Sequence, residues 1–154
     1  MNAFMEPKII LKRVYDPPDP ADGTRVLVDR LWPRGVAKRD ARIDGWARDL
    51  APSAALRRWF RHDSARWPGF RDAYRAELAQ APAALRRLLA SCARGPVTLV
   101  YAARDRQHNH AVVLREVLLA EWQAWHEPND PASPVCYAPK SAPGPNAPSG
   151  NGDA

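Results

Sequence analysis

Residues 26–35 read VLVDRLWPRG, an apolar run that passes directly into an acid, two arginines, a tryptophan and a proline. Together with Thr24 and Arg25 before it, the run has the β-branched, apolar composition of a strand that is buried on both faces of a sheet. Charged and aromatic side chains directly after such a strand are typical of a ligand site at the end of a sheet. The stretch therefore predicts a central strand and the position of a site.

Two other stretches have strand patterns. In IILKRVYDPPDP (residues 9–20), Ile9 and Leu11 share one face, Ile10 and Val14 share the other, and the prolines predict a turn. In PVTLVYAA (residues 96–103), a short continuous apolar run follows a glycine, as expected for another central strand.

Helical patterns lie between and after these strands. Apolar side chains recur at helical spacing, and capping residues or prolines mark where each helix begins. The sequence predicts helices over residues 41–50 after Asp40, 54–60 after Ser53, 63–78 with Asp63 or Ser64 as the cap, 82–94 from Pro82 to Gly95, and 110–125 after Asn109. In the third helix, Pro68 and Gly69 predict a kink, with regular helix only from about Phe70. This order of elements predicts an α/β protein, a three-layer α/β domain with a largely parallel central sheet.

Length and composition predict one domain. The chain has 154 residues and is 45% hydrophobic, and it becomes rich in Pro, Gly, Ser and Asn from residue 127. We expect a single domain over residues 6–126 and a disordered tail over residues 127–154. Apolar runs fall far short of the roughly 20 residues that cross a bilayer, and the N-terminus does not resemble a signal peptide. The expected location is the cytoplasm, without membrane contact, and Cys92 and Cys136 are expected not to form a disulfide.

Polar side chains follow all three predicted strands. Because the carboxyl ends of parallel strands meet at one edge of a sheet, we expect these side chains to converge there. The predicted ligand-binding residues are Arg13, Tyr15, Arg30, Trp32, Arg34, Tyr101, Arg104, Asn109 and His110, and the predicted catalytic residues are Asp29 and Asp105.

Each residue type has a chemical role in this prediction. Arg30, Arg34 and Arg104 bind charge, since a guanidinium grips a phosphate or carboxylate at two points. Asp29 or Asp105 orients the ligand or moves a proton. The alternatives are that Asp29 forms a buried salt bridge with Arg13 or Arg104, and that the arginines form a solvated surface. The start of the last helix, after ARDRQHN (residues 103–109), is the best candidate for an anion cradle.

Several common motifs are absent from the sequence. It contains no GxGxxG, GxxxxGK[ST], GxSxG, CxxC or HExxH word. His108 and His110 alternate in a loop, where such side chains point apart as often as together, so we predict no metal site. The cofactor stays unknown.

The words KRVYDPP, GTRVLVDRLWPRG, LAPSAALRRWFRHD and LVYAARDRQHNHAVVL resemble the short, YeaO-like group of the bacterial DUF488 family over about residues 9–119. In longer relatives, cysteines stand where this chain has Tyr101 and Asn109, and a histidine stands at His110. The resemblance therefore implies no thiol mechanism for this chain. The family is defined by sequence, so the resemblance implies no particular reaction.

Two functional hypotheses follow. The first is a protein that binds or acts on a small anionic ligand, such as a phosphate, a carboxylate or a nucleotide-like molecule, in an arginine-rich pocket at the strand ends. The alternative is a nucleic-acid-binding or regulatory module, because the net charge is +6 and the part of the chain before residue 127 carries +8. Arginines along consecutive helices also support it, namely Arg57, Arg58, Arg61, Arg66, Arg71 and Arg75, although they fit an ordinary solvated helix face as well. A third possibility is an interaction scaffold without a deep pocket. The sequence leaves open whether the protein is an enzyme and what its oligomeric state is.

Overall fold

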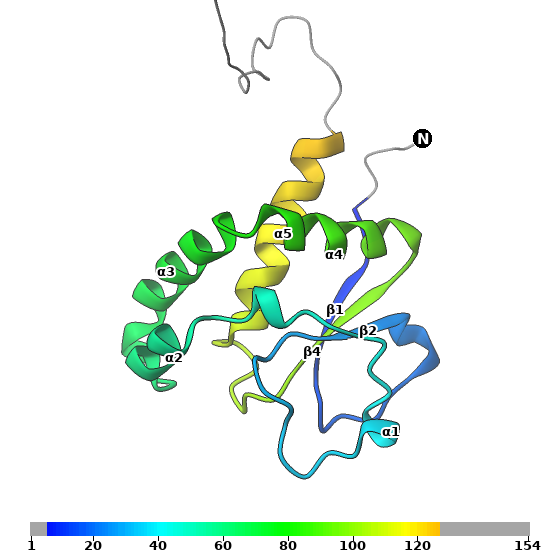
Figure 1. Ribbon diagram of the computed structural model, residues 1–154, viewed down its shortest axis with the longest axis horizontal. Coiled ribbons are helices and arrows are strands. Elements are labelled where there is room, and N and C mark those ends of the chain that lie inside the picture. Colours follow the sequence, from blue (N-terminus) through cyan, green and yellow to red (C-terminus); the bar gives the residue numbers. More distant parts are fainter. Residues whose placement is uncertain (1–5, 127–154) are drawn as a thin grey trace, which may run out of the picture.

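The computed structural model describes residues 6–126, which form a four-stranded parallel sheet covered by helices (Figure 1). The strands are β1 (Ile9–Arg13), β2 (Thr24–Leu27), β3 (Gly45–Trp46) and β4 (Val97–Tyr101), in the order β1-β4-β2-β3. The three predicted strands are confirmed, and every pair is parallel. Val97 of β4 pairs with both Ile9 and Thr24, so the three long strands begin at one level and end at one edge. The tail predicted for residues 127–154, including Cys136, lies outside the described residues.

Each face of the sheet packs against its own apolar cluster. The sheet and the segments that cover its two faces therefore form three layers. Along β4, Val97 and Leu99 pack into the main core with the helices that cover that face, and Val100 packs into a smaller cluster on the other face. This is the alternation that a strand imposes on its side chains. The helices are α1 (Lys38–Ala41), α2 (Ala54–Phe60), α3 (Trp67–Ala79), α4 (Pro82–Arg94) and α5 (His110–His126), with 3-10 turns η1 (Pro20–Asp22), η2 (Arg48–Leu50) and η3 (Ser64–Arg66). Residues of α2 to α5 line the main core, and α1 packs on the opposite face.

Two predicted caps are confirmed. The Ser53 hydroxyl accepts the N–H of Leu56 at the start of α2, and the Asn109 side-chain oxygen accepts the N–H of Val112 at the start of α5. Both satisfy amide groups that have no partner inside the helix. They fix where two helices begin beside the strand ends.

The helix predicted over residues 41–50 is wrong. The chain forms α1, then the edge strand β3, then η2. Arg42 adopts a left-handed conformation (φ 52°) that ends α1, and the Asp44 carboxylate accepts the N–H of Arg25 while the Asp44 N–H donates to the Arg25 carbonyl. Pairing with β2 satisfies more backbone groups than a short exposed helix would, so tertiary contacts override the helical pattern.

The kink predicted at Pro68 and Gly69 is also wrong, because α3 begins at Trp67. Pro68 lies in the first turn, where its missing N–H has no helical partner to lose. Gly69 leaves room for Trp59, since a Cβ at this position would lie 2.8 Å from the indole. The two residues therefore start the helix and seat a side chain from α2.

A buried ion network joins the Lys12 side chain of β1 to the segment before β2 and to the start of β2. The Asp22 carboxylate lies 2.6 Å from Nη1 of Arg25 and 2.9 Å from Nζ of Lys12. Arg25 also donates from Nε and Nη2 to the Ala41 carbonyl, so the guanidinium is almost fully paired inside the domain. This network lies at the end of the sheet opposite to the site that the sequence predicts. Within residues 6–126, no helix is both long and apolar enough to cross a membrane.

Candidate functional site

A pocket of about 420 Å³ lies at the carboxyl ends of β2 and β4. It is bounded by the segments that follow these two strands, by the start of α5 and by α2. Its polar lining residues are Asp29, Arg30, Arg57, Arg58, His62, Asn109 and His110. Its apolar lining residues are Leu31, Pro52, Phe60, Phe70, Ala102 and Ala103. Four residues that the sequence predicts for the site, Asp29, Arg30, Asn109 and His110, therefore meet in one pocket.

Asp29 and His110 form the pair at the inner side of this pocket. Asp29 Oδ2 accepts the N–H of Ala102 at 3.2 Å, which links the ends of β2 and β4. Nε2 of His110 lies 3.0 Å from Asp29 Oδ1 and 3.1 Å from the Val28 carbonyl oxygen. The carbonyl meets hydrogen-bond geometry, and His110 Nε2 is the one cationic partner of Asp29 among the described residues. The Asp29 side chain is 17% exposed and lines the pocket, so its carboxylate can accept a hydrogen bond from an N–H or O–H group of a ligand.

Three arginines line the pocket without acidic partners. Arg57 and Arg58 lie on the exposed side of α2, and Arg30 follows Asp29 with its Nε 3.4 Å from the Pro52 carbonyl oxygen. Among residues 6–126, no carboxylate forms an ion pair with any of the three. With Asp29 the lining of the pocket is net positive, so the pocket favours an anion.

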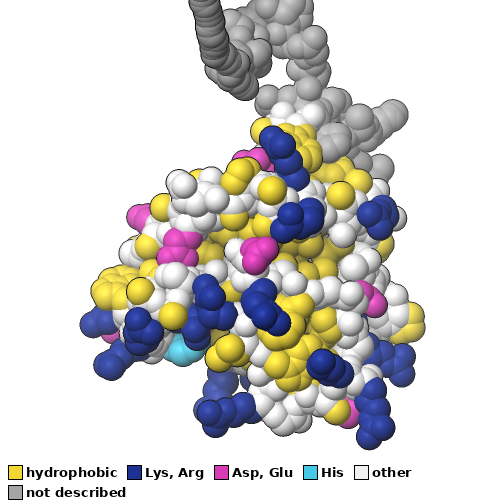
Figure 2. Space-filling model, in the orientation of Figure 1, with side chains coloured by type: hydrophobic (Ala, Val, Ile, Leu, Met, Phe, Trp, Pro, Cys, Tyr) yellow, Lys and Arg dark blue, Asp and Glu magenta, His cyan; other side chains and the backbone are white. Residues whose placement is uncertain are grey.

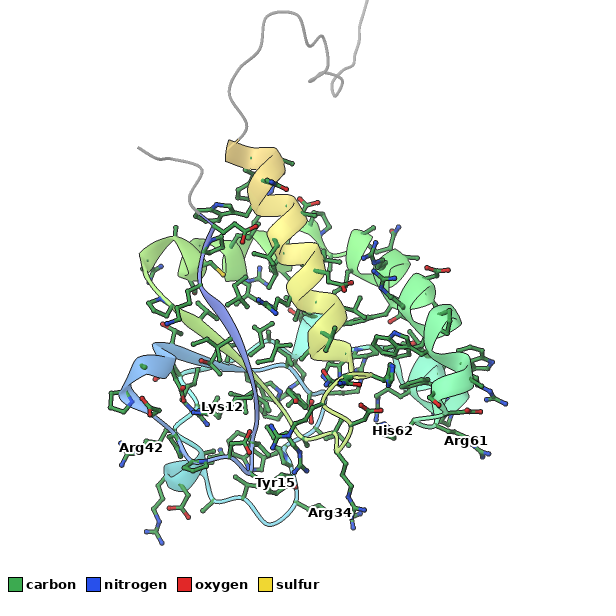
Figure 3. The ribbon with its side chains drawn as sticks, turned by 180° about the vertical axis from the view of Figure 1, so that it is seen from behind. Lys12, Tyr15, Arg34, Arg42, Arg61 and His62 are labelled. Atoms are coloured by element: carbon green, nitrogen blue, oxygen red, sulfur yellow. The ribbon has the colours of Figure 1, made fainter. Side chains whose placement is uncertain are left out.

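The pocket also has an aromatic wall. Phe60 and Phe70 stack with ring centroids 4.4 Å apart, and the stack continues to Trp67. Phe60 is the last residue of α2, and the two residues after it, Arg61 and His62, both have left-handed backbones (φ 49° and 55°). This conformation costs of order 1 kcal/mol for a residue with a side chain. It turns the chain at the end of α2 and leaves His62 at the rim of the pocket; Arg61 and His62 are marked in Figure 3.

Three predicted residues lie at the strand ends but do not line the pocket. Arg13 donates from Nε to the Ala103 carbonyl at 2.8 Å and from Nη2 to the Ala102 carbonyl at 3.2 Å, so it supports the chain after β4. Tyr15 is about half exposed and its hydroxyl donates to the Arg34 carbonyl (Figure 3). Trp32 donates to the Val36 carbonyl and packs in the smaller core cluster.

The other predicted residues also lie outside the pocket lining. Arg34 and Arg104 are exposed, and neither is the partner of Asp29, whose partner is His110. Tyr101 points into the main core, where burial raises the pKa of its hydroxyl. Asp105 is exposed, and the N–H groups of His108 and Gln107 hold the pKa of its carboxyl below the usual range. The convergence predicted from the sequence is thus partial, since Arg34 and Asp105 do not meet Asp29 in the pocket.

Hydrogen bonds fix the loop that carries Asn109 into the pocket. The guanidinium of Arg106 binds both oxygens of Asp16 at 2.9 Å each, which ties the loop after β4 to the end of β1 and lowers the pKa of Asp16. The Asn109 side chain donates to the Asp105 carbonyl and caps α5. The rim of the pocket beside β4 is therefore held by paired side chains, in contrast to the unpaired arginines of α2.

The sequence analysis missed three pocket residues, Arg57, Arg58 and His62. They lie 22 to 27 residues after the DRLWPRG word, which ends at Gly35. The two arginines are on α2, where they fit an ordinary solvated face equally well, and His62 follows the end of this helix. The signal in the sequence is that α2 contains two adjacent arginines and no acid. That this helix lies over the strand ends follows from the tertiary structure.

Comparisons with known proteins agree on one family. The family model described as "Inactive DUF488-N3 subclade" matches residues 8–138. The "Uncharacterized protein YeaO" of Escherichia coli (strain K12) is 45% identical over 107 residues, which is 70% of this chain and 93% of that protein. The "Uncharacterized protein Rv3073c" of Mycobacterium tuberculosis (strain ATCC 25618 / H37Rv) is 43% identical over 113 residues, 73% of this chain and 95% of that protein. No solved structure gives a significant match.

Proposed function

Because the chain belongs to the DUF488 family, and within it to the group described as the inactive DUF488-N3 subclade, we propose that it binds a small anionic ligand in the pocket beside α2 without acting on it. The word "inactive" in the family description favours binding over catalysis. Asp29, which the sequence analysis places among the catalytic residues, orients the ligand in this proposal. Asp105 has no contact with the ligand and organises the loop before α5.

One observation carries the proposal: three arginines without acidic partners line a single pocket at the strand ends. Arg57 and Arg58 are neighbours on α2, and Arg30 approaches from the segment after β2. A phosphate or carboxylate accepts charge-assisted hydrogen bonds from guanidinium groups, and such bonds are about twice as strong as neutral ones. An anion bound in the pocket would neutralise the positive charges of these three arginines.

Asp29 limits the ligand further. Its carboxylate lines the pocket and can only accept hydrogen bonds, so the ligand should carry an N–H or O–H group on the side away from its anionic group. Sulfate lacks this group, whereas a phosphorylated sugar, a nucleotide or an amino acid has one. The volume of about 420 Å³ lies within the range of roughly 300–1,000 Å³ that is common for small-molecule sites.

The aromatic wall favours a ligand with a flat apolar part. The stacked Phe60 and Phe70 line the pocket together with Leu31, whose side chain is 68% exposed. Ordering Leu31 over a ligand would remove apolar surface from water, which stabilises a complex. Among the three ligand classes, a nucleoside monophosphate combines the anion, the donor and the flat ring.

The test is a thermal-shift titration of the full chain with nucleoside monophosphates, sugar phosphates, amino acids, inorganic phosphate and sulfate. A ligand at 100 times its Kd stabilises the folded state by about 2.7 kcal/mol. We expect a nucleoside monophosphate to raise Tm by several degrees, and Arg57→Ala to reduce this shift strongly. Arg34→Ala is the matched control, because Arg34 is an exposed arginine outside the pocket lining.

Two outcomes contradict the proposal. In the first, no member of the panel raises Tm of the wild-type protein. In the second, a ligand raises Tm equally in wild type and Arg57→Ala, which would place it elsewhere. Asp29→Asn should weaken binding of ligands with a donor and leave binding of sulfate nearly unchanged.

A further inference from the structure

We infer that the pocket receives one nucleotide of a single-stranded nucleic acid, and that the surface of α2 next to the pocket binds the neighbouring nucleotides. This inference rests on the proposed function, because the pocket must accept a nucleotide. It adds a second contact region, which we call the α2 surface and define by Arg57, Arg58, Trp59 and Arg61.

The arginines of the α2 surface have no acidic partners, whereas several other exposed arginines of the domain do. Elsewhere Arg71 and Arg75 share Glu116, Arg106 binds Asp16 and Arg87 faces Asp49. On α2, by contrast, the side chains of Arg57, Arg58 and Arg61 are exposed and form no ion pair with any carboxylate of residues 6–126.

Figure 2 shows Lys and Arg side chains gathered over the α2 end of the molecule, beside a histidine. A cluster of unpaired cations on one helix repels itself unless an anion binds there. Because a small ligand can fill the pocket but not the outer side of α2, the charge pattern fits an extended anion.

Trp59 supplies the feature that separates a nucleic acid from other polyanions. Its side chain is 45% exposed, and the guanidinium of Arg66 lies 5.3 Å from the ring centroid. The indole rests on Gly69, where a Cβ would come within 2.8 Å of it. Exposed aromatic side chains among cations bind single strands, because each unpaired base has a flat face that can stack.

The geometry places these features within reach of one short strand. A helix of seven residues such as α2 is about 10 Å long, so the two pocket arginines, Trp59 and Arg61 lie within the span of a few nucleotides. The pocket is concave, so a base must leave a duplex to enter it. The site therefore fits a single strand, in RNA or DNA, better than a duplex.

The experiment measures binding of the full chain to labelled eight-nucleotide RNA and DNA single strands, to a DNA duplex and to a glutamate oligomer, by fluorescence anisotropy at 50 mM salt. A nucleoside monophosphate is titrated separately. Two variants, Trp59→Ala and Arg61→Asn, each remove one side chain of the α2 surface. Neither residue lines the pocket, so both variants leave the pocket lining intact. Asparagine tolerates the left-handed backbone of residue 61, so this variant removes charge with little strain.

The domain offers a matched control for Trp59. Trp125 is 48% exposed and has the guanidinium of Arg86 5.7 Å from its ring centroid, so Trp125→Ala removes a similar exposed tryptophan. It lies near the end of α5, about 22 Å along the helix from His110 in the pocket.

We expect the single strands to bind at least about tenfold more tightly than the monophosphate. Trp59→Ala should weaken strand binding at least about fivefold, since one stacked base contributes about 1–3 kcal/mol. Arg61→Asn should also weaken it, and both variants should leave the affinity for the monophosphate unchanged. If about three phosphates are neutralised, raising salt from about 50 to 200 mM should weaken strand binding about 20-fold. The RNA and DNA arms show which sugar is preferred.

The inference is overturned if strands bind no more tightly than the monophosphate, if Trp59→Ala and Trp125→Ala have equal effects, or if the duplex or the glutamate oligomer binds as tightly as the single strands. In each of these cases a monophosphate that still binds in the pocket leaves the proposed function standing. If the monophosphate does not bind the wild-type protein, the proposed function fails first.

Discussion

Asp22→Asn should reduce the free energy of unfolding by about 3 kcal/mol at pH 7. Asp22 is 3% exposed and accepts hydrogen bonds from Lys12, Arg25 and the N–H of Asp19. The substitution keeps the volume but leaves the buried Arg25 guanidinium without its counter-charge. Breaking a buried pair in this way costs about 3–5 kcal/mol, and the lower value applies because Arg25 keeps two hydrogen bonds to the Ala41 carbonyl and Lys12 can reach water.

The effect of Asp22→Asn should depend on pH in a defined direction. Burial raises the pKa of Asp22, but the hydrogen bonds from Lys12, Asp19 and Arg25 outweigh it and hold the pKa below the usual 3.8. A carboxyl whose pKa is lower in the folded state stabilises that state fully above 3.8, and this stabilisation is lost as the pH falls through the folded value. The difference between wild type and variant should therefore stay constant from about pH 7 to 5 and shrink below about pH 4.

The assay is urea unfolding followed by tryptophan fluorescence, at several pH values, for wild type, Asp22→Asn and Asp49→Asn. Asp49 is the control, because it pairs with Arg87 at 3.4 Å while both side chains are mostly exposed, and such pairs contribute about 0–1 kcal/mol. A loss below about 1 kcal/mol for Asp22→Asn at pH 7, or a loss that persists unchanged at about pH 3, would refute this account of the network.

Two further predictions concern the backbone and the core. Gly23→Ala should lower the free energy of unfolding by more than about 2 kcal/mol, because Gly23 has φ 65° and an added Cβ would lie 2.1 Å from the Pro96 carbonyl oxygen. Gly45→Ala is the control, because a Cβ added at Gly45 has no atom within 4 Å. Equal losses of Tm in the two variants would contradict this reasoning. Burial raises the pKa of the Cys92 thiol to about 11, so in a Cys136→Ser chain it should react slowly with a disulfide reagent at about pH 8 and quickly after unfolding. Rapid labelling of the folded chain would contradict its burial.

Local signals in the sequence predicted much of the fold. The apolar runs before Asp29 and Arg104 became β2 and β4, and Ser53 and Asn109 cap the helices that they precede. These features depend on residues close together along the chain. The strand β3 has two residues, too few for a periodic pattern, and it forms because the edge of β2 is available for pairing. The pairing that allows Arg25 to be buried depends on Asp22 and Ala41 in three dimensions.

The candidate site could be predicted only where its residues follow a strand or begin the helix after it. Asp29 and Arg30 follow β2, and Asn109 and His110 begin α5, so topology alone brings them together. Whether such a residue faces the pocket depends on the direction of its side chain, which is why Arg13 supports the backbone after β4. The α2 arginines line the pocket because α2 packs over the strand ends. The sequence contains no local signal for this packing, so these residues could not be assigned to the site.

A titration followed by amide NMR tests the central claim most directly, namely that the strand ends and α2 form one binding pocket. With ¹⁵N-labelled full-length protein and a nucleoside monophosphate, we predict that the largest chemical-shift changes map to residues 29–31, 57–62, 102–103 and 109–110. Changes confined to other surfaces, such as the cleft lined by Arg39, Asp40 and Arg42 at the opposite end of the sheet, or no changes at millimolar ligand, would contradict it.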